Sequence, residues 1–301
     1  MISIFPPHFV VIVYASVLCG AVCAEESTTR NVVVTGENEG EHDQFTELGE
    51  YAQPAWAERS RMSSTTSVYV LSPYEFFVGN IWEGNFGHDG GSAHDLTHEI
   101  DVGLLHRFEL GIENELGVIR GDGHETSTTF EARYAFANWN ALPFNPTLSA
   151  EYILGFGKSA KLSDGKSTSH QPDAIALRLL LGQNFGDHVA YGANFAVEQD
   201  TSRGGCNFDF SQTIVYGGTW NGKLEFGVEG RFTNISQRSR IKEQDELAIG
   251  PTIGWKPTRQ LRISFEPLFG CTRESPRLTS LLLVSYEFGG AEAVVSRVPH
   301  D

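Results

Sequence analysis

Residues 75–288 divide into twelve consecutive segments in which apolar and polar side chains alternate. In one of these segments, 174–184, Ile175 and Leu177 fall on one face and Arg178 falls on the other. Side chains of a β-strand point alternately to opposite sides, so each segment has one apolar and one polar face. The sequence therefore predicts an all-β chain built from about twelve half-apolar antiparallel strands.

The links between these segments are alternately short and long. Short links fall near residues 106–107, 185–187, 220–222 and 256–259. Longer links, rich in Gly, Ser, Asp and Lys, fall at 87–94, 121–125, 159–172, 200–206, 235–243 and 271–277, and 138–146 is a longer link on the short side. This alternation is typical of an up-and-down transmembrane β-barrel. In a soluble β-sandwich or a lipocalin-like barrel, the alternative, the apolar faces would instead meet in a core.

The N-terminus has the pattern of an export signal. Residues 9–22 are apolar, and small residues precede a possible cleavage site ahead of Glu25. A helical anchor is the alternative for this stretch. Residues 68–71 predict either a short strand or a segment folded under or into the barrel. The expected organisation is a signal peptide at 1–24, a partly flexible periplasmic segment at 25–74, the barrel at 75–288 and a C-terminal tail at 289–301.

The polar faces of the strands carry more acids than bases, in a chain whose net charge is −16. The acids expected to face inward are Glu99, Asp101, Glu113, Glu115, Glu131, Glu151, Glu198, Asp209, Glu225, Glu229, Glu266 and Glu287, and the bases are Arg133, Arg178, Arg231 and Arg262. If the barrel encloses an open lumen, these side chains line it, and the acidic excess favours cations. Alternatively, the same side chains pair into a polar network that fills a closed barrel.

Two cysteines, Cys206 and Cys271, lie outside the expected signal peptide. The compartment that an export signal implies permits a disulfide. Both cysteines fall at the loop ends of strands, on one side of the barrel, but these strands are not neighbours. The sequence therefore leaves two possibilities, a disulfide between loops that fold over the barrel mouth and two free thiols.

No pattern of catalytic, metal-binding or cofactor-binding residues survives the strand assignment. His94 and His98 have the spacing of a zinc-binding helix. On a strand, however, four residues span roughly 13 Å, which one ion cannot bridge. The chain has no phosphate-binding glycine loop, no basic stripe for nucleic acid, and no His-x-Ser-Asn-Gly motif of the outer-membrane phospholipases. We therefore expect no enzyme, no metal, no cofactor and no nucleic-acid partner.

The stretch 103–115, GLLHRFELGIENE, resembles the second hairpin of bacterial outer-membrane barrels described as putative transporters of the phenol-degradation, MetA-pathway type. The segment 280–288, SLLLVSYEF, is similar to the C-terminal strand signal of outer-membrane proteins, although a tail follows Phe288. The resemblance implies a Gram-negative outer membrane, contact with its lipid, and passage of small, apolar compounds; it supplies no catalytic residues.

The function expected from the sequence is therefore a passive pore or transporter for small solutes. A closed barrel without conductance, with a structural or surface-interaction role, is the alternative. Inward glycines such as Gly111, Gly182 and Gly227 leave room in the lumen and favour the pore. The solute and the oligomeric state stay open at this level.

Overall fold

The structure is a computed structural model that describes residues 45–48, 50–53, 69–119, 122–156, 172–186, 188–201, 205–219, 223–236, 244–258, 260–290 and 294–297. Within these ranges there is no helix that is both long and apolar enough to span a membrane. The chain forms two compact units. One unit contains the barrel, and the other includes parts of β1 (Phe45–Leu48) and of β14 (Val294–Arg297). The strands β1 and β14 pair as a two-stranded sheet.

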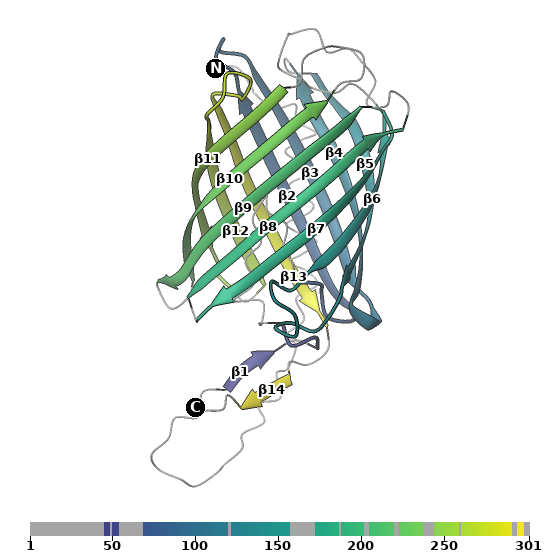
Figure 1. Ribbon diagram of the computed structural model, residues 1–301, viewed down its shortest axis with the longest axis vertical. Helices are drawn as coiled ribbons and strands as arrows, with labels where there is room; N and C mark the ends of the chain where they lie inside the picture. Colours follow the sequence, from purple (N-terminus) through teal and green to yellow (C-terminus); the bar gives the residue numbers. More distant parts are fainter. Residues whose placement is uncertain are drawn as a thin grey trace. The chain divides into compact units, whose positions relative to one another are not determined.

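The barrel consists of twelve antiparallel strands that pair in chain order (Figure 1). They are β2 (Glu75–Phe86), β3 (Ser92–Gly103), β4 (Phe108–Ile119), β5 (Asp122–Ala135), β6 (Thr147–Gly155), β7 (Ala174–Phe185), β8 (Val189–Asp200), β9 (Cys206–Thr219), β10 (Leu224–Ser236), β11 (Gln244–Trp255), β12 (Leu261–Gly270) and β13 (Leu278–Gly289). The last strand pairs with the first, Leu283 lying opposite Ile81, and this pairing closes the barrel. The predicted fold class is confirmed.

The apolar faces of the strands point outward, where they stay exposed. On β7, the exposed fractions of Ile175, Leu177 and Leu179 are 49%, 53% and 38%, whereas Ala176 and Leu180 on the opposite face are buried. Other exposed large apolar residues are Leu110, Ile112, Phe130, Leu148, Tyr152, Phe195, Val197, Ile214, Phe226, Val228, Ile249, Ile253, Phe265 and Phe269. A wall of this kind suits contact with lipid rather than water.

The links between strands lie on two rims of the barrel. The turn rim holds the links that follow β3, β5, β7, β9 and β11, and the loop rim holds those that follow β2, β4, β6, β8, β10 and β12. The predicted long link at 121–125 is wrong, because β5 begins at Asp122 and its pairing with β4 continues to Ile119. The pairing of β4 with β5 contains a register shift between Glu115 and Leu116, which interrupts the alternation of side chains. The start of β5 therefore could not be recognised from the sequence pattern.

Two pieces of the chain before β2 pack against the turn rim. We call them the cap, residues 50–53 and 69–74. Tyr69, Val70 and Leu71 are buried and do not form a strand. For residues 69–71 the structure therefore has the second of the two predicted arrangements, a segment folded under the barrel. The link 136–146, which contains the predicted exception to the short turns at 138–146, packs against the cap. The backbone amide of its Trp139 donates to the carbonyl oxygen of Tyr51 at 2.9 Å.

We expect Leu179→Arg to destabilise the barrel by about 2–4 kcal/mol, because Leu179 lies near the middle of an outward strand face and a charge at the bilayer midplane is costly. Leu179→Ala is the matched control, since it shortens the side chain without adding charge. Urea titrations of the refolded variants in lipid vesicles measure the difference. Equal tolerance of the two substitutions would contradict a lipid-facing position for Leu179.

Candidate functional site in the barrel interior

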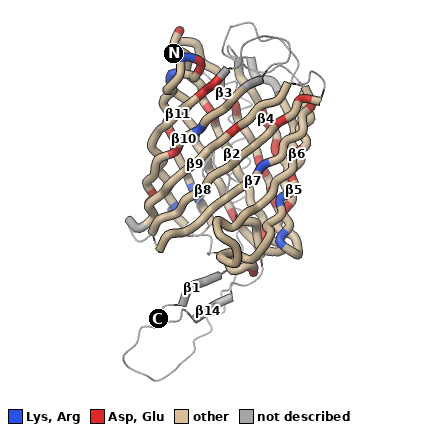
Figure 2. Tube along the Cα trace, viewed as in Figure 1, with Lys and Arg blue, Asp and Glu red and all other residues tan. Residues whose placement is uncertain are grey.

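The inward face of the barrel carries a dense set of ionisable side chains. Figure 2 marks where Lys, Arg, Asp and Glu occur along the strands. Eight buried acids belong to the described part of the chain, Glu99, Asp101, Glu109, Glu131, Glu151, Glu225, Glu229 and Glu266, against three buried bases, Arg133, Lys256 and Arg262. Each acid occupies the strand face opposite the exposed apolar residues, as alternation requires. The interior is therefore polar and acidic.

Arg133 on β5 is the centre of the largest interior cluster. Its Nε lies 2.5 Å from Glu131 Oε1, and its Nη1 lies 2.7 Å from Glu109 Oε1 on β4. Glu99 and Asp101 on β3 lie within 3.5 and 3.8 Å of the same guanidinium. Ser149 on β6 completes the cluster by donating to Glu131 at 2.5 Å. One buried guanidinium thus joins four neighbouring strands through ion pairs and hydrogen bonds.

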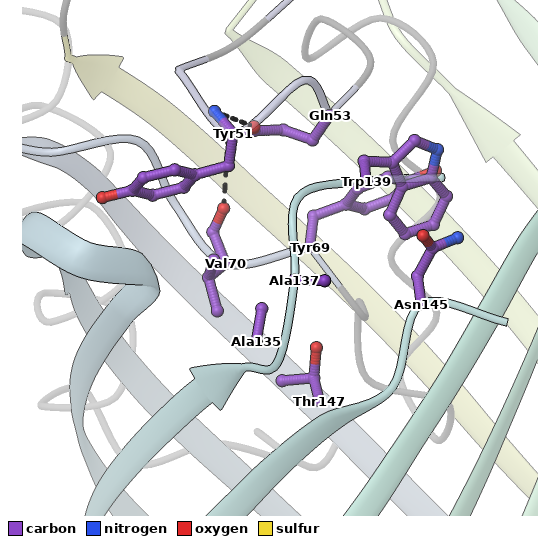
Figure 3. A pocket seen from close by; sticks show the side chains of 9 residues that line it. All are labelled: Tyr51, Gln53, Tyr69, Val70, Ala135, Ala137, Trp139, Asn145 and Thr147. Carbon is purple, nitrogen blue, oxygen red and sulfur yellow. Dashed lines mark hydrogen bonds between the residues drawn. The ribbon is translucent and has the colours of Figure 1, made fainter. Parts of the chain in front are cut away.

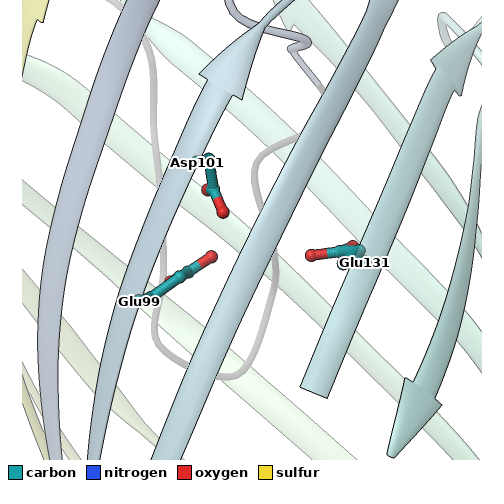
Figure 4. A group of neighbouring side chains, drawn as sticks. All are labelled: Glu99, Asp101 and Glu131. Carbon is teal, nitrogen blue, oxygen red and sulfur yellow. The ribbon is translucent and has the colours of Figure 1, made fainter. Parts of the chain in front are cut away.

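Three of these carboxylates point toward one another (Figure 4). One oxygen each from Glu99, Asp101 and Glu131 lies within 4.8 Å of the others, a spacing that could hold a metal ion. Arg133, however, makes an ion pair with every one of them. The guanidinium supplies the positive charge that such a group of acids requires in a buried site, so the cluster is explained without an ion.

A second cluster joins β10, the turn after β11, and β12. Glu225 accepts from Arg262 Nη2 at 2.8 Å and forms a short ion pair with Lys256. Lys256 lies in the turn, just beyond Trp255, and is 2% exposed. Burial lowers the pKa of the Lys256 ammonium to about 8, against the opposing effect of the Glu225 carboxylate. Together with the first cluster, this one places buried charge close to the turn rim.

The interior is less tightly packed around other charged residues. Glu113 and Glu115 on β4 are only half-buried, and so are Arg178 and Arg231. Arg178 still makes a 2.5 Å ion pair with Glu151. Arg231 lies 3.7 Å from Glu83, and both side chains keep about a third of their surface exposed, at 38% and 28%. Glu83, Glu115 and Arg231 belong to the loop-rim halves of their strands.

The cap connects to the Arg133 cluster. The backbone amide of Leu71 donates to Glu109 Oε2 at 2.7 Å, while the other oxygen of Glu109 binds Arg133. The cap backbone also lies directly over Gly103, where an added Cβ would meet the Ser72 carbonyl oxygen at 2.0 Å. Gly103 therefore has to be glycine for the cap to sit at this depth.

Aromatic contacts hold the cap on the turn rim. The Tyr69 ring packs on Trp139 with centroids 4.2 Å apart, and its hydroxyl bonds Asn184 Oδ1 at 3.3 Å. Tyr51 donates to the carbonyl oxygen of Leu104 at 2.8 Å. A small cavity remains between the cap and the rim (Figure 3), lined by Tyr51, Gln53, Tyr69, Val70, Ala135, Ala137, Trp139, Asn145 and Thr147. The cap thus covers this part of the turn rim with side chains rather than leaving it open.

The structure brings several of the predicted interior residues together and separates others. Arg133 collects Glu99, Asp101 and Glu131, and Arg178 binds Glu151, whereas Glu229 and Glu266 lie fully buried on β10 and β12, away from Arg133. Sequence reasoning missed Glu109, which alternation from Glu113 would have identified. It also missed Lys256, because turn residues are normally exposed.

The possible disulfide between Cys206 and Cys271 is not formed, since both are free thiols. Cys206 opens β9 and Cys271 follows β12, with β10 and β11 between them. Three inter-strand steps of about 4.8 Å separate the two positions by roughly 14 Å. A disulfide tolerates only about 4.4–6.8 Å between Cα atoms. Both cysteines do lie on the same rim, as expected.

No protein-family model matches the chain, and no curated protein matches it in sequence. Among solved structures, it is similar to the COG4313 outer membrane channel from Pseudomonas putida F1, with a TM-score of 0.55 and 9% identity over 76% of this chain and 100% of that chain. The KdgM porin (TM-score 0.46, 14% identity) and the NanC porin (0.47, 8%) each cover 71% of this chain and 99% of their own. The first likeness confirms the barrel fold, and the apolar wall is the surface that a membrane-spanning barrel presents to lipid.

We expect Arg133→Gln to destabilise the folded barrel by about 3–5 kcal/mol, because it leaves a group of buried carboxylates without their counter-charge. Arg273→Gln is the matched control, since Arg273 is exposed in the link after β12. Urea unfolding of the two variants in lipid vesicles checks the prediction. A cost for Arg133→Gln no larger than that of the control would show that the cluster does not stabilise the fold.

Proposed function

We propose that the barrel is a passive outer-membrane channel for small solutes and that it favours cations. The observation that carries the proposal is the charge of its interior, where, among the residues that the structure describes, eight buried acids face three buried bases. In a dry and purely structural interior, uncompensated carboxylates are costly. Water or mobile cations entering the lumen relieve that cost, so an acidic excess supports a wet interior.

The half-buried carboxylates Glu113 and Glu115 are the residues best placed to select ions. They face the lumen from β4, next to the Arg133 cluster, and keep partial exposure. A ring or patch of carboxylates raises the local concentration of cations and repels anions. In this proposal, Arg133 and its partners form the rigid wall, and Glu113 and Glu115 form the selective surface.

The finer proposal concerns the solute. The resemblance to transporters of the phenol-degradation type implies small, apolar compounds, whereas the acidic interior supports small cations and polar solutes. The charges that line the described lumen support the polar class, because an apolar solute gains nothing from desolvating carboxylates. Uptake of a small apolar compound by the refolded barrel would reverse this choice.

One observation favours the alternative, a closed barrel with a structural role. The charged residues nearest the turn rim are almost completely buried, and the cap covers part of that rim. A side-chain network of this kind can fill a barrel of intermediate size. Conductance separates the two functions directly, because a closed barrel passes no ions under conditions in which a known porin does.

We expect the refolded protein to conduct in planar bilayers and to prefer cations. Glu113→Gln with Glu115→Gln should lower the cation-to-anion permeability ratio by roughly half, because two carboxylates leave the selective surface. Reversal potentials in a salt gradient measure the ratio. Asp245→Asn is the control, since Asp245 is exposed on the outward face of β11. Absence of conductance in the unmodified protein would favour the closed barrel.

The cap should limit the conductance. Gly103→Ala places a methyl group where the Ser72 carbonyl oxygen now lies and should displace the cap while leaving the lumen charges in place. We therefore expect a higher single-channel conductance from this variant. Gly230→Ala is the control, because a Cβ there meets only Ile249 Cγ1, at 3.9 Å. An unchanged conductance in Gly103→Ala would mean that the cap does not obstruct the path.

A further inference from the structure

A row of polar side chains crosses the outer wall of the barrel. Asn80 on β2 lies opposite His98 on β3, His98 lies opposite Asn114 on β4, and Asn114 lies opposite Thr128 on β5. The Asn80 amide oxygen lies 2.6 Å from His98 Nδ1, and Asn114 Nδ2 donates to Thr128 Oγ1 at 3.2 Å. Four adjacent strands thus present one continuous polar row, which we call the outer polar row.

The row points away from the lumen. On β3, His98 shares its face with Ile100, which is 52% exposed, while Glu99 between them is buried inside. On β4, Asn114 shares its face with Ile112, and on β5 Thr128 shares its face with Phe130. The four row residues are half-buried, whereas the apolar side chains of Ile100, Ile112 and Phe130 on the same strand faces are exposed.

The row also lies near the middle of the strands. Asn80 is the sixth of twelve residues in β2, and His98 and Asn114 are each the seventh of twelve in β3 and β4. Near the midplane of a bilayer there is neither water nor a lipid headgroup to bind amide, imidazole and hydroxyl groups. The row meets part of this need through its own hydrogen bonds, but His98 Nε2, which is enclosed by surrounding atoms, has no hydrogen-bond partner among the described residues.

We propose that the outer polar row is the contact surface for a second copy of this chain, side by side in the same membrane. A partner must bring polar groups to the same depth. A second copy inserted in the same direction does so automatically, because a two-fold axis along the membrane normal places identical residues at identical depths. Asn, neutral His and Thr each carry both a donor and an acceptor, so the row complements itself.

The chemistry of the row does not complete a catalytic site. The Asn80 amide beside the His98 imidazole resembles the arrangement in hydrolases where one side chain orients the histidine that acts as the base. A hydrolase also needs a nucleophile within hydrogen-bond reach of the imidazole. Within the parts of the chain that the structure describes, no hydrogen bond joins His98 to a hydroxyl group. Thr128, the hydroxyl of the row, lies two strands from His98 and is held by Asn114. The row is therefore better explained as a contact surface.

The test compares leucine substitutions on two walls of the barrel. His98→Leu and Asn114→Leu remove the polar groups from the row, and Gln212→Leu makes the same kind of change at an exposed, outward position of β9. Two copies of each variant with different C-terminal tags are co-expressed, extracted from membranes in mild detergent and purified through one tag. Analytical ultracentrifugation then gives the mass of each purified particle.

We expect the unmodified protein and Gln212→Leu to carry the second tag and to sediment as dimers. His98→Leu and Asn114→Leu should lose at least nine-tenths of the second tag and sediment as monomers. Heat-dependent migration in gels verifies that each barrel has folded. Monomeric behaviour of the unmodified protein would overturn the proposal, and so would dimers that persist in both row variants. Increased stability of monomeric row variants over an unmodified monomer would show that the row faces only lipid.

Discussion

The structure depends on closure of the sheet by the pairing of β13 with β2. Inside a bilayer, every backbone amide and carbonyl needs a partner within the protein, and an open sheet edge would leave a row of them unsatisfied. With twelve strands paired in a ring, no edge remains. Closure also separates two environments, because the alternation of side chains now assigns each residue either to the lipid or to the interior.

Once closed, the barrel concentrates charge in a restricted space. Among the described residues, Arg133 and Glu225 act as junctions of the interior. Arg133 binds acids on β3, β4 and β5, and Glu225 binds Lys256 in the turn after β11 and Arg262 on β12. These junctions explain how so many acids can be buried, although their bases remain too few to neutralise them. The excess of acids supports the proposed channel, and the cap, which binds Glu109, covers part of its turn rim.

The outer wall, in contrast to the charged interior, is mostly apolar. Most outward positions are apolar, as contact with lipid requires, and the outer polar row interrupts them on β2 to β5. Polar groups at this depth need partners within protein, and the row finds part of them across the strands, as the interior charges do. The interior therefore bears on the passage of solutes, and the outer wall bears on the association of two copies. Either property can hold without the other.

The sequence alone determined the strands, their number and the faces of residues such as Glu99, Glu131 and Leu177, because a period of two is a local property of an extended chain. Only the tertiary structure decided which residues meet. The bond between Arg133 and Glu109 depends on the register of β4 against β5, and the alignment of Asn80 with His98 depends on that of β2 against β3. Register follows from pairing around the whole ring, and the packing of the cap on Gly103 depends on contacts between segments distant in sequence.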